Sequence, residues 1–289
     1  MRGIVARHPV ASFLVLAYTV TAAVSLVPYL TRRDLLPLEV APYDVIASLV
    51  ALAAAAFVVT WAADGPAGVR DLALRSVRWK VGLRWYALAL LAVPTLMLVG
   101  AFAIDPPGTA DAIATDWPRL LTHVLPQLIV LVLFLNWAEE IGFTGFLFAR
   151  LQVRHGALKG CLIVGVFFSI WHIPFFVVET GSILEALLVL GFLFIPQLAS
   201  RFIVGWIYNS TGYSLLLVGL FHATFNGTVN SMGLGRQVLG MSPGIALLVA
   251  NLIVVLGAVV ILVATKGKLS ETPAQESRPP ISDVGGTGS

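Results

Sequence analysis

Residues 137–146 read W-A-E-E-I-G-F-T-G-F and place two adjacent carboxylates, Glu139 and Glu140, inside an apolar run. Neither 120–138 nor 141–149 contains an Asp, Glu, Lys or Arg. A charged side chain at the centre of a bilayer costs about 2.5–3.5 kcal/mol on insertion scales. Two neighbouring glutamates in such a segment therefore indicate a polar cavity, with partner residues supplied by other helices.

The composition of the whole chain is that of a membrane protein. Of the 289 residues, 58% are hydrophobic and 11% are charged, whereas soluble domains carry about 25% charged residues. The net charge of +3 reflects basic loops and does not predict a nucleic-acid partner. The single cysteine, Cys161, excludes an internal disulfide and a multi-cysteine metal site. We therefore expect a multi-pass protein of the cell membrane, in contact with its lipids.

Apolar runs of about 20 residues are long enough to cross a bilayer as helices. Eight such runs lead us to predict an all-α membrane protein, a bundle of eight transmembrane helices around an intramembrane polar cavity. The predicted spans are 9–30, 45–63, 85–104, 124–149, 157–178, 183–208, 213–230 and 244–265.

The charges of the loops orient these spans. Basic residues gather at 70–84, at 150–159 and after the last span, and positive charge marks the cytoplasmic side. Both termini are therefore predicted to be cytoplasmic. We divide the chain into N-terminal transmembrane helices with a basic cytoplasmic loop (1–119), a helical core that contains the two glutamates (120–265) and a cytoplasmic tail (266–289). The tail is rich in Ser, Pro and Gly and is predicted to be disordered.

Polar residues from three of these helices fall at a similar depth. At a rise of 1.5 Å per residue, Glu139 lies roughly 16 Å, His222 about 15 Å and His172 roughly 20 Å from the cytoplasmic end of its own span. Asn226 follows His222 by four residues and shares its helix face. A carboxylate beside an imidazole can deprotonate a water, and a second imidazole with an amide can stabilise an oxyanion. These groups suit the hydrolysis of a peptide bond.

Each of these residues also has a structural interpretation. A single intramembrane His or Asn often forms a hydrogen bond between helices, and Phe168, one turn before His172, is typical of a core residue. The same residue types could bind a zinc ion with an open coordination position, with Glu139, His172 and His222 as the candidate ligands. A metal-free mechanism that depends on the glutamate is an equal alternative.

Three short motifs occur in order along the chain: E-E-I-G-F-T at 139–144, F-S-I-W-H at 168–172 and H-A-T-F-N at 222–226. They resemble the E-E-x-x-x-R, F-x-x-x-H and H-x-x-x-N/D motifs of the CPBP family of intramembrane proteases. That family includes type II CAAX prenyl endopeptidases and proteins for bacteriocin processing or self-immunity. The resemblance covers about 136–230.

The resemblance implies a role for each residue. Glu139 would be the general base on the attacking water, with His172 beside it. His222 and Asn226 would form the oxyanion site. Glu140 would be a supporting carboxylate that orients His172. Members of the family are described both as metalloproteases and as glutamate-dependent proteases that need no metal.

The chain departs from the family at Thr144, which stands where the first motif has its arginine. Because threonine cannot neutralise a carboxylate, either Glu140 is protonated, or another cation replaces the arginine, or activity is impaired. Arg201 is the candidate cation, since it lies roughly 16 Å deep in the same layer as the glutamates. Its alternative is a residue that faces a cavity or reaches to the interface. This leads to the hypothesis that Arg201 pairs with Glu140.

The sequence thus favours a membrane-embedded endopeptidase, a candidate metalloprotease, that cleaves a peptide near the inner face of the membrane. Its substrate would be a peptide or protein, such as a lipidated C-terminus in CAAX-type processing or a bacteriocin precursor in maturation or self-immunity. Two alternatives stay open. One is a catalytically impaired member that acts as a membrane scaffold or immunity protein, which Thr144 supports. The other is a proton-coupled transporter that uses the glutamates as a relay.

Overall fold

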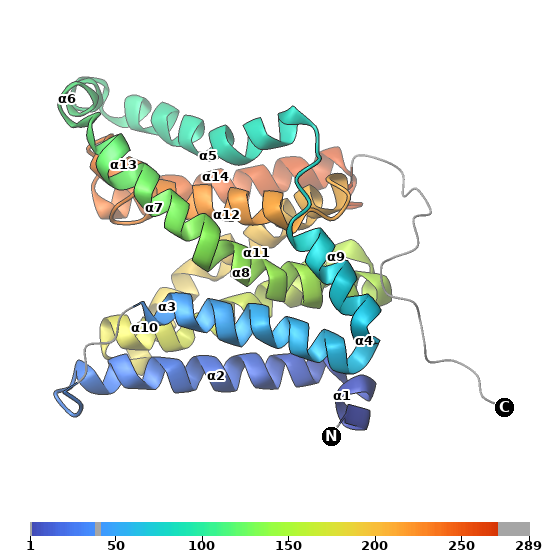
Figure 1. Ribbon diagram of the computed structural model, residues 1–289. Coiled ribbons are helices and arrows are strands. Elements are labelled where there is room, and N and C mark those ends of the chain that lie inside the picture. Colours follow the sequence, from blue (N-terminus) through green and yellow to red (C-terminus); the bar gives the residue numbers. More distant parts are fainter. Residues whose placement is uncertain (1, 38–41, 271–289) are drawn as a thin grey trace.

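The computed structural model describes residues 2–37 and 42–270, and within these ranges the chain is helical and contains no strand. Figure 1 shows the helices packed side by side, most of them along a common direction. The predicted all-α membrane class is confirmed. Most of the predicted tail, from residue 271 onward, lies outside the described residues.

The N-terminal helices form the lower part of the molecule in Figure 1. They are α1 (Arg2–Arg7), α2 (Pro9–Thr31), α3 (Tyr43–Ile46), the π-helical segment η1 (Ala47–Ala54) and α4 (Ala55–Ser76). Pro9 stands at the first position of α2, where its missing N–H leaves no hydrogen bond unmade. Within α4 the chain bends at Gly65, whose φ of 69° is accessible because glycine has no Cβ.

A long helical stretch runs through the middle of the chain after α5 (Leu83–Ile104) and α6 (Pro106–Asp116). Its successive elements are η2 (Leu120–Val124), α7 (Leu125–Val130), η3 (Leu131–Asn136), α8 (Trp137–Glu140), η4 (Ile141–Phe148), α9 (Ala149–Trp171) and α10 (Ile173–Thr180). The chain turns back on itself inside α9 at Gly156, which has a φ of 79°. The turn brings the second motif back beside the first.

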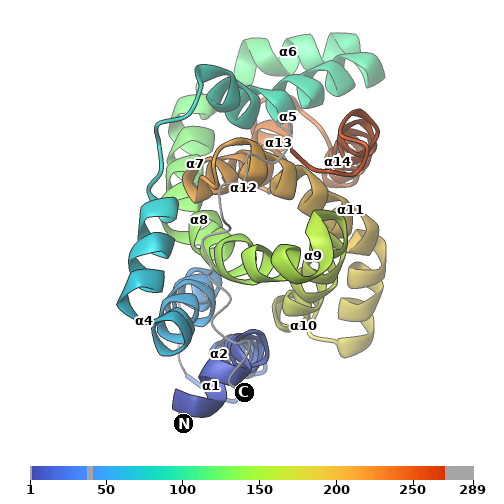
Figure 2. The same cartoon turned by 90° about the vertical axis from the view of Figure 1, so that its right-hand side faces the viewer.

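The C-terminal helices complete the bundle. They are α11 (Ile183–Ser210), α12 (Leu215–Val229), α13 (Leu234–Gln237) and α14 (Pro243–Ala264). In Figure 2, α8, α9, α11 and α12 lie around a common centre, with α2 and α4 on one side and α5, α6 and α14 on the other. The three motifs therefore face one another from separate helices.

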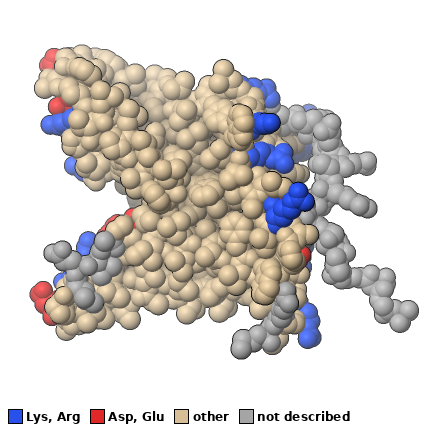
Figure 3. Space-filling view, in the orientation of Figure 1, with Lys and Arg blue, Asp and Glu red and all other residues tan. Residues whose placement is uncertain are grey.

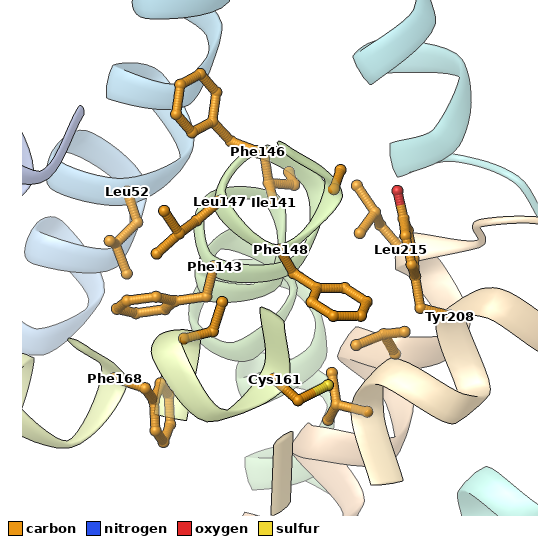
Figure 4. Packing of buried hydrophobic residues seen from close by; sticks show 14 of the residues in the cluster. Leu52, Ile141, Phe143, Phe146, Leu147, Phe148, Cys161, Phe168, Tyr208 and Leu215 are labelled. Atoms are coloured by element: carbon orange, nitrogen blue, oxygen red, sulfur yellow. The ribbon is translucent and has the colours of Figure 1, made fainter. Parts of the chain in front are cut away.

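The segment η4 forms the middle of the core, and all eight of its residues are buried. Two glycines let neighbouring helices approach it closely. A Cβ at Gly142 would lie 2.9 Å from Leu52 Cβ, and one at Gly145 would lie 2.5 Å from Leu215 Cδ1. Figure 4 shows the aromatic and aliphatic side chains that pack around this segment. Close packing at small residues is how membrane helices associate, and here it fixes the position of the adjacent glutamates.

Six helical stretches among the described residues are long and apolar enough to cross a membrane. Two of the predicted spans, 124–149 and 157–178, fall within a single stretch, Leu120–Thr180, which the turn at Gly156 divides. The predicted span 213–230 corresponds to α12, which has 15 residues and is shorter than the other candidates. The predicted number of eight therefore stays a prediction.

Charged side chains mark the two ends of the bundle differently. Figure 3 shows most of the visible Lys and Arg at the end where α4 and α9 lie, and most of the visible acidic side chains at the opposite end, together with some Lys or Arg. This separation agrees with the loop charges from which a cytoplasmic position of both termini is predicted. The orientation itself stays a prediction.

Candidate active site

Glu140 is a fully buried carboxylate whose two oxygens are both occupied. Arg201 Nη1 lies 3.1 Å from Oε1 and 3.3 Å from Oε2. His222 Nδ1 lies 2.7 Å from Oε1, and the Thr144 hydroxyl donates a hydrogen bond to Oε2. A buried ion pair needs such additional hydrogen bonds to offset its desolvation. Glu140 is thus a fixed anion held by α11, α12 and its own helical stretch.

Arg201 supplies the cation that Thr144 cannot. The hypothesised ion pair with Glu140 is present, and the arginine side chain is only 3% exposed. The guanidinium carbon lies 4.0 Å from the centroid of the Phe168 ring, a distance typical of a cation–π contact. Phe168 is a buried core residue, as the structural interpretation has it, and in addition holds this arginine in place.

The imidazole partner of Glu140 is His222, so the expectation that Glu140 orients His172 is wrong. His172 instead has its Nδ1 atom 2.7 Å from the carbonyl oxygen of Phe168 in its own helix. The reason is the packing of α12 against α8, which brings His222 over the glutamates. Because the first motif and α12 are far apart in sequence, helical spacing could not reveal this choice.

His172 is held by its own turn of helix and by aromatic rings. A carbonyl oxygen can only accept a hydrogen bond, so Nδ1 carries a proton, and in the neutral ring Nε2 then keeps its lone pair. The imidazole stands edge-on to Phe168 with 4.6 Å between centroids, and stacks on Phe176 at 5.8 Å. Trp171 packs beside it and donates its indole N–H to Thr21 Oγ1 at 2.8 Å. The ring is therefore fixed with an acceptor nitrogen available.

Glu139 has far fewer partners than its neighbour. Its carboxylate oxygen Oε1 accepts a hydrogen bond from Ser48 Oγ at 3.2 Å, and Oε2 lies 3.8 Å from His222 Nδ1. The residue is 5% exposed and borders the cavity described next. Ser48, on η1, is fully buried. Sequence reasoning missed it because one serine in an apolar helix gives no directional signal.

A cavity of about 390 Å³ lies between α8, α9, α11, α12 and α14. Six of the predicted site residues line it: Glu139, Phe168, His172, Arg201, His222 and Asn226. The other two, Glu140 and Thr144, are absent from its wall and lie behind it. The structure therefore brings the predicted residues together. It also distinguishes the two glutamates, because Glu139 borders the cavity and Glu140 does not.

The cavity extends toward the acidic end of the bundle. Its lining reaches Asp44 on α3 and the exposed Glu179 on α10. Figure 3 shows the molecule hollowed at this end, between α3 and α10 below and α13 above. Arg32 Nη1, at the end of α2, donates to Val178 O at 2.9 Å and fixes this rim.

The predicted metal ligands do not form a metal site. Among the described residues, no three His, Cys, Asp or Glu side chains are grouped as a metal ion would require. Glu139, His172 and His222 line the same cavity, and the contact of His222 Nδ1 with Glu140 leaves Nε2 as the ring nitrogen that could face a ligand. The described residues are thus not grouped as the zinc set proposed from the sequence requires.

Three carboxamides of the cavity wall were not predicted as site residues: Gln197, Asn251 and Asn230, which follows the end of α12. Gln197 lies on α11 and Asn251 on α14, and each interrupts an otherwise apolar part of its helix. A polar residue in a membrane helix is the signal that could have identified them. The signal is weak, since such a residue can equally form a hydrogen bond between helices.

The fold and site define a helical membrane protein in which a carboxylate–imidazole cluster borders an intramembrane cavity. Residues 121–228 match the family model described as Type II CAAX prenyl endopeptidase Rce1-like. The chain is also similar to a Methanococcus maripaludis protein described as CAAX prenyl protease 2, with 27% identity over 137 residues. That match covers 46% of this chain, and the chain spans about half the length of this curated relative. These matches confirm the resemblance to the CPBP family.

Proposed function

We propose that the protein is an intramembrane endopeptidase that hydrolyses a peptide bond with a water activated by Glu139 and His172. One observation carries the proposal. Of two adjacent buried glutamates, Glu140 has its lone pairs occupied by three side chains, whereas Glu139 has one hydrogen bond and borders the cavity. A general base needs a carboxylate that can still accept a proton from a bound water.

The reaction begins with a water held between Glu139 and the Nε2 acceptor of His172. Glu139 takes a proton from this water as its oxygen attacks the carbonyl carbon of the substrate, and the carbonyl π electrons move onto the oxygen. His222, in its protonated form, and the Asn226 amide donate hydrogen bonds to this oxyanion. When the C–N bond breaks, Glu139 returns the proton to the leaving amine.

Glu140 and Arg201 act in this scheme as positioning residues. Glu140 fixes the His222 ring through Nδ1, and Arg201 keeps the carboxylate ionised by remaining beside it. Preorganised donors are effective because they need not rearrange as charge develops. Since Arg201 compensates for Thr144, the main reason to consider a catalytically impaired scaffold is removed. The transporter alternative draws no specific support from the cavity, which reaches one end of the bundle.

The substrate class depends on which side of the membrane the acidic end faces. With the predicted orientation, that end is extracytoplasmic, and the substrate is a peptide presented there, as in bacteriocin maturation or self-immunity. A lipidated CAAX-type C-terminus would require the acidic end to face the cytoplasm, because proteins of that type are modified there. The loop charges favour the first class over cleavage near the inner face.

Cleavage by the purified protein in proteoliposomes tests the proposal. The probes are synthetic peptides with and without a farnesylated C-terminal cysteine motif, and mass spectrometry identifies the products. Glu139→Gln and His172→Ala should each lower the rate by about 100- to 10,000-fold, the usual contribution of a general acid–base group. Glu185→Gln and His155→Ala are matched controls outside the cavity lining. Wild-type cleavage rates in Glu139→Gln would overturn the mechanism.

A further inference from the structure

Asn251 is an isolated polar side chain in the wall of the cavity. The helix that carries it, α14, contains no other Asn or Gln and no charged residue between Pro243 and Ala264. Asn251 is 9% exposed and lines the cavity. Within the described part of the chain, its side chain forms no hydrogen bond. Its amide atoms are not among the fully buried ones and are open to the cavity, where apolar residues make up the rest of the helix.

Gln197 has the same property on the neighbouring helix. Its side-chain oxygen Oε1 is buried and has no hydrogen-bond partner among the described residues. The residue lines the same cavity from α11. Two helices thus each contribute one carboxamide whose hydrogen-bonding capacity is unused.

The two carboxamides lie at the same level of the bundle. Both α11 and α14 begin at the acidic end and run side by side, and a Cβ at Gly257 would lie 3.4 Å from Ile203 Cδ1. Gln197 precedes Ile203 by six residues, and Asn251 precedes Gly257 by six. At 1.5 Å per residue, each lies about 9 Å from this contact, on the side of the acidic end. Other lining residues keep the same register: Leu193 with Leu247, and Ser200 with Val254.

The level of this pair relates it to the proposed catalytic groups. Gln197 precedes Arg201 by four residues, which places it on the same helix face and about 6 Å nearer the acidic end. Arg201 contacts Glu140, the neighbour of Glu139. An extended peptide advances about 3.3 Å per residue. The pair is therefore about two peptide residues away from the catalytic groups.

A carboxamide offers one acceptor oxygen and an NH₂ donor. These match the N–H and C=O groups of a peptide main chain, so recognition needs no particular substrate side chain. Carboxamides on two adjacent helices can bind one residue of an extended chain from two directions. One turn nearer the acidic end, the wall that these two helices form is apolar at Leu193 and Leu247. Such a wall cannot compete for those hydrogen bonds.

We propose that Gln197 and Asn251 form a main-chain binding site that holds an extended peptide substrate about two residues from the bond that is cleaved. This inference rests on the proposed peptidase function and adds a positioning site to it. The site explains why two amides remain in a region of the bundle where apolar residues would pack more favourably. It also assigns α14, which lies outside the residues matched by the family model, a part in substrate binding.

A pair of substrates separates main-chain recognition from a structural role. One is a fluorescent peptide that the wild-type protein cleaves, and the other has an ester in place of the amide two residues from the scissile bond. For the amide peptide, Asn251→Leu should raise KM about tenfold with little change in kcat. A change of about this size is expected when one hydrogen bond to a buried group is lost. For the wild-type protein, KM should be higher for the ester than for the amide peptide by a similar factor. For Asn251→Leu, the two peptides should have the same KM.

Binding measured in the Glu139→Gln background keeps this test independent of cleavage. Anisotropy of the same labelled peptides gives the Kd for each variant, and Asn251→Gln, which keeps a carboxamide, should recover part of the loss. The matched control is Gln127→Leu, another amide of a membrane helix that lies outside the cavity lining. It should leave KM and Kd unchanged.

Three outcomes distinguish this inference from the proposed function. In the first, the ester raises KM and Kd by the same factor in the wild-type protein and in both Asn251→Leu and Gln197→Leu. This result would overturn the main-chain binding site without contradicting the proposed peptidase function. Unchanged affinity for the amide peptide in both variants would do the same. Loss of the ester penalty in those variants, together with undiminished cleavage by Glu139→Gln, would support the binding site and overturn the catalytic assignment.

Discussion

Two clusters of charged side chains in the bundle each contain a buried arginine, and they differ in what surrounds them. The α4 cluster consists of Asp64, Asp71, Arg75, Arg150 and Tyr208. The glutamate cluster consists of Glu139, Glu140, Arg201 and His222. Both contain arginines that are less than one-tenth exposed. Only the glutamate cluster contributes residues to the cavity of about 390 Å³ among the described residues.

In the α4 cluster each arginine pairs with a carboxylate and donates further hydrogen bonds. Arg75 donates to Tyr208 Oη at 2.6 Å, to Gly145 O at 3.0 Å and to Asp71 at 2.8 Å. Arg150 pairs with Asp64 and lies over the Phe146 ring. These contacts join α4 to η4 and α11. The cluster therefore connects helices, and none of its five residues lines the cavity.

In the glutamate cluster, one carboxylate has all its hydrogen-bonding partners and the other has few. Glu140, like Arg75, has three hydrogen-bonding partners, whereas Glu139 can accept further hydrogen bonds next to the cavity. The comparison teaches that a buried charge is not by itself a sign of function. Incomplete pairing beside a cavity is the feature that separates a chemical site from a structural one. The following variants test that distinction, beginning with the largest expected effect.

Arg201→Leu should be the most destabilising change, because it leaves Glu140 as an uncompensated buried charge. Breaking such a pair typically costs about 3–5 kcal/mol of unfolding free energy. Unfolding of the protein in detergent micelles measures it. Adding Glu140→Gln should recover most of the stability, since it removes the unpaired charge, but it should not restore cleavage. Equal stability of Arg201→Leu and the wild type would mean that Glu140 is not an anion in the folded protein.

Arg75→Leu should lower stability by a smaller amount, about 1.5–3 kcal/mol, because it removes charge-assisted hydrogen bonds to Tyr208 and Gly145 while Asp71 is partly exposed to solvent. The cleavage rate per folded molecule should stay at the wild-type level. Unfolding curves and active-fraction-corrected rates provide the two measurements. A large loss of rate in folded Arg75→Leu would assign the α4 cluster a part in catalysis.

Thr144→Arg tests whether Arg201 has taken over the role of the motif arginine. Thr144 is 1% exposed, so the larger side chain should cost about 1–3 kcal/mol through overpacking and by repelling Arg201. Combined with Arg201→Leu, the same substitution should be stabilising, because Glu140 regains a cation from its own helix. The double-mutant cycle in unfolding free energy gives the coupling. If the two substitutions changed the unfolding free energy additively, an arginine at position 144 would not replace Arg201 as the cation beside Glu140.

Glu179→Cys should have the smallest effect on stability, since Glu179 is exposed at the rim of the cavity. It reports on orientation. A membrane-impermeant maleimide should label this cysteine in intact cells, whereas Lys159→Cys at the opposite end should react only after the membrane is opened. The native Cys161 is 1% exposed and serves as an unreactive background. The reverse pattern would place the cavity mouth in the cytoplasm and favour the CAAX-type substrate.

The sequence by itself determined the class of the protein and most of the candidate site. Apolar runs predicted a helical membrane protein because a bilayer leaves backbone groups no other partners. The cost of intramembrane charge singled out Glu139, Glu140 and Arg201, and the i,i+4 spacing of the second and third motifs identified His172 and His222. These are local properties, which a chain expresses whatever its neighbours are.

Only the tertiary structure decided how these residues are paired. It set His222 rather than His172 against Glu140, and left Glu139 open to the cavity. It also added Gln197 and Asn251 to the wall, at one level on two parallel helices. The physical reason is that a helix apolar on all sides carries no pattern that tells which face meets which neighbour. Helix packing makes that choice, and it separates the structural glutamate from the proposed catalytic one.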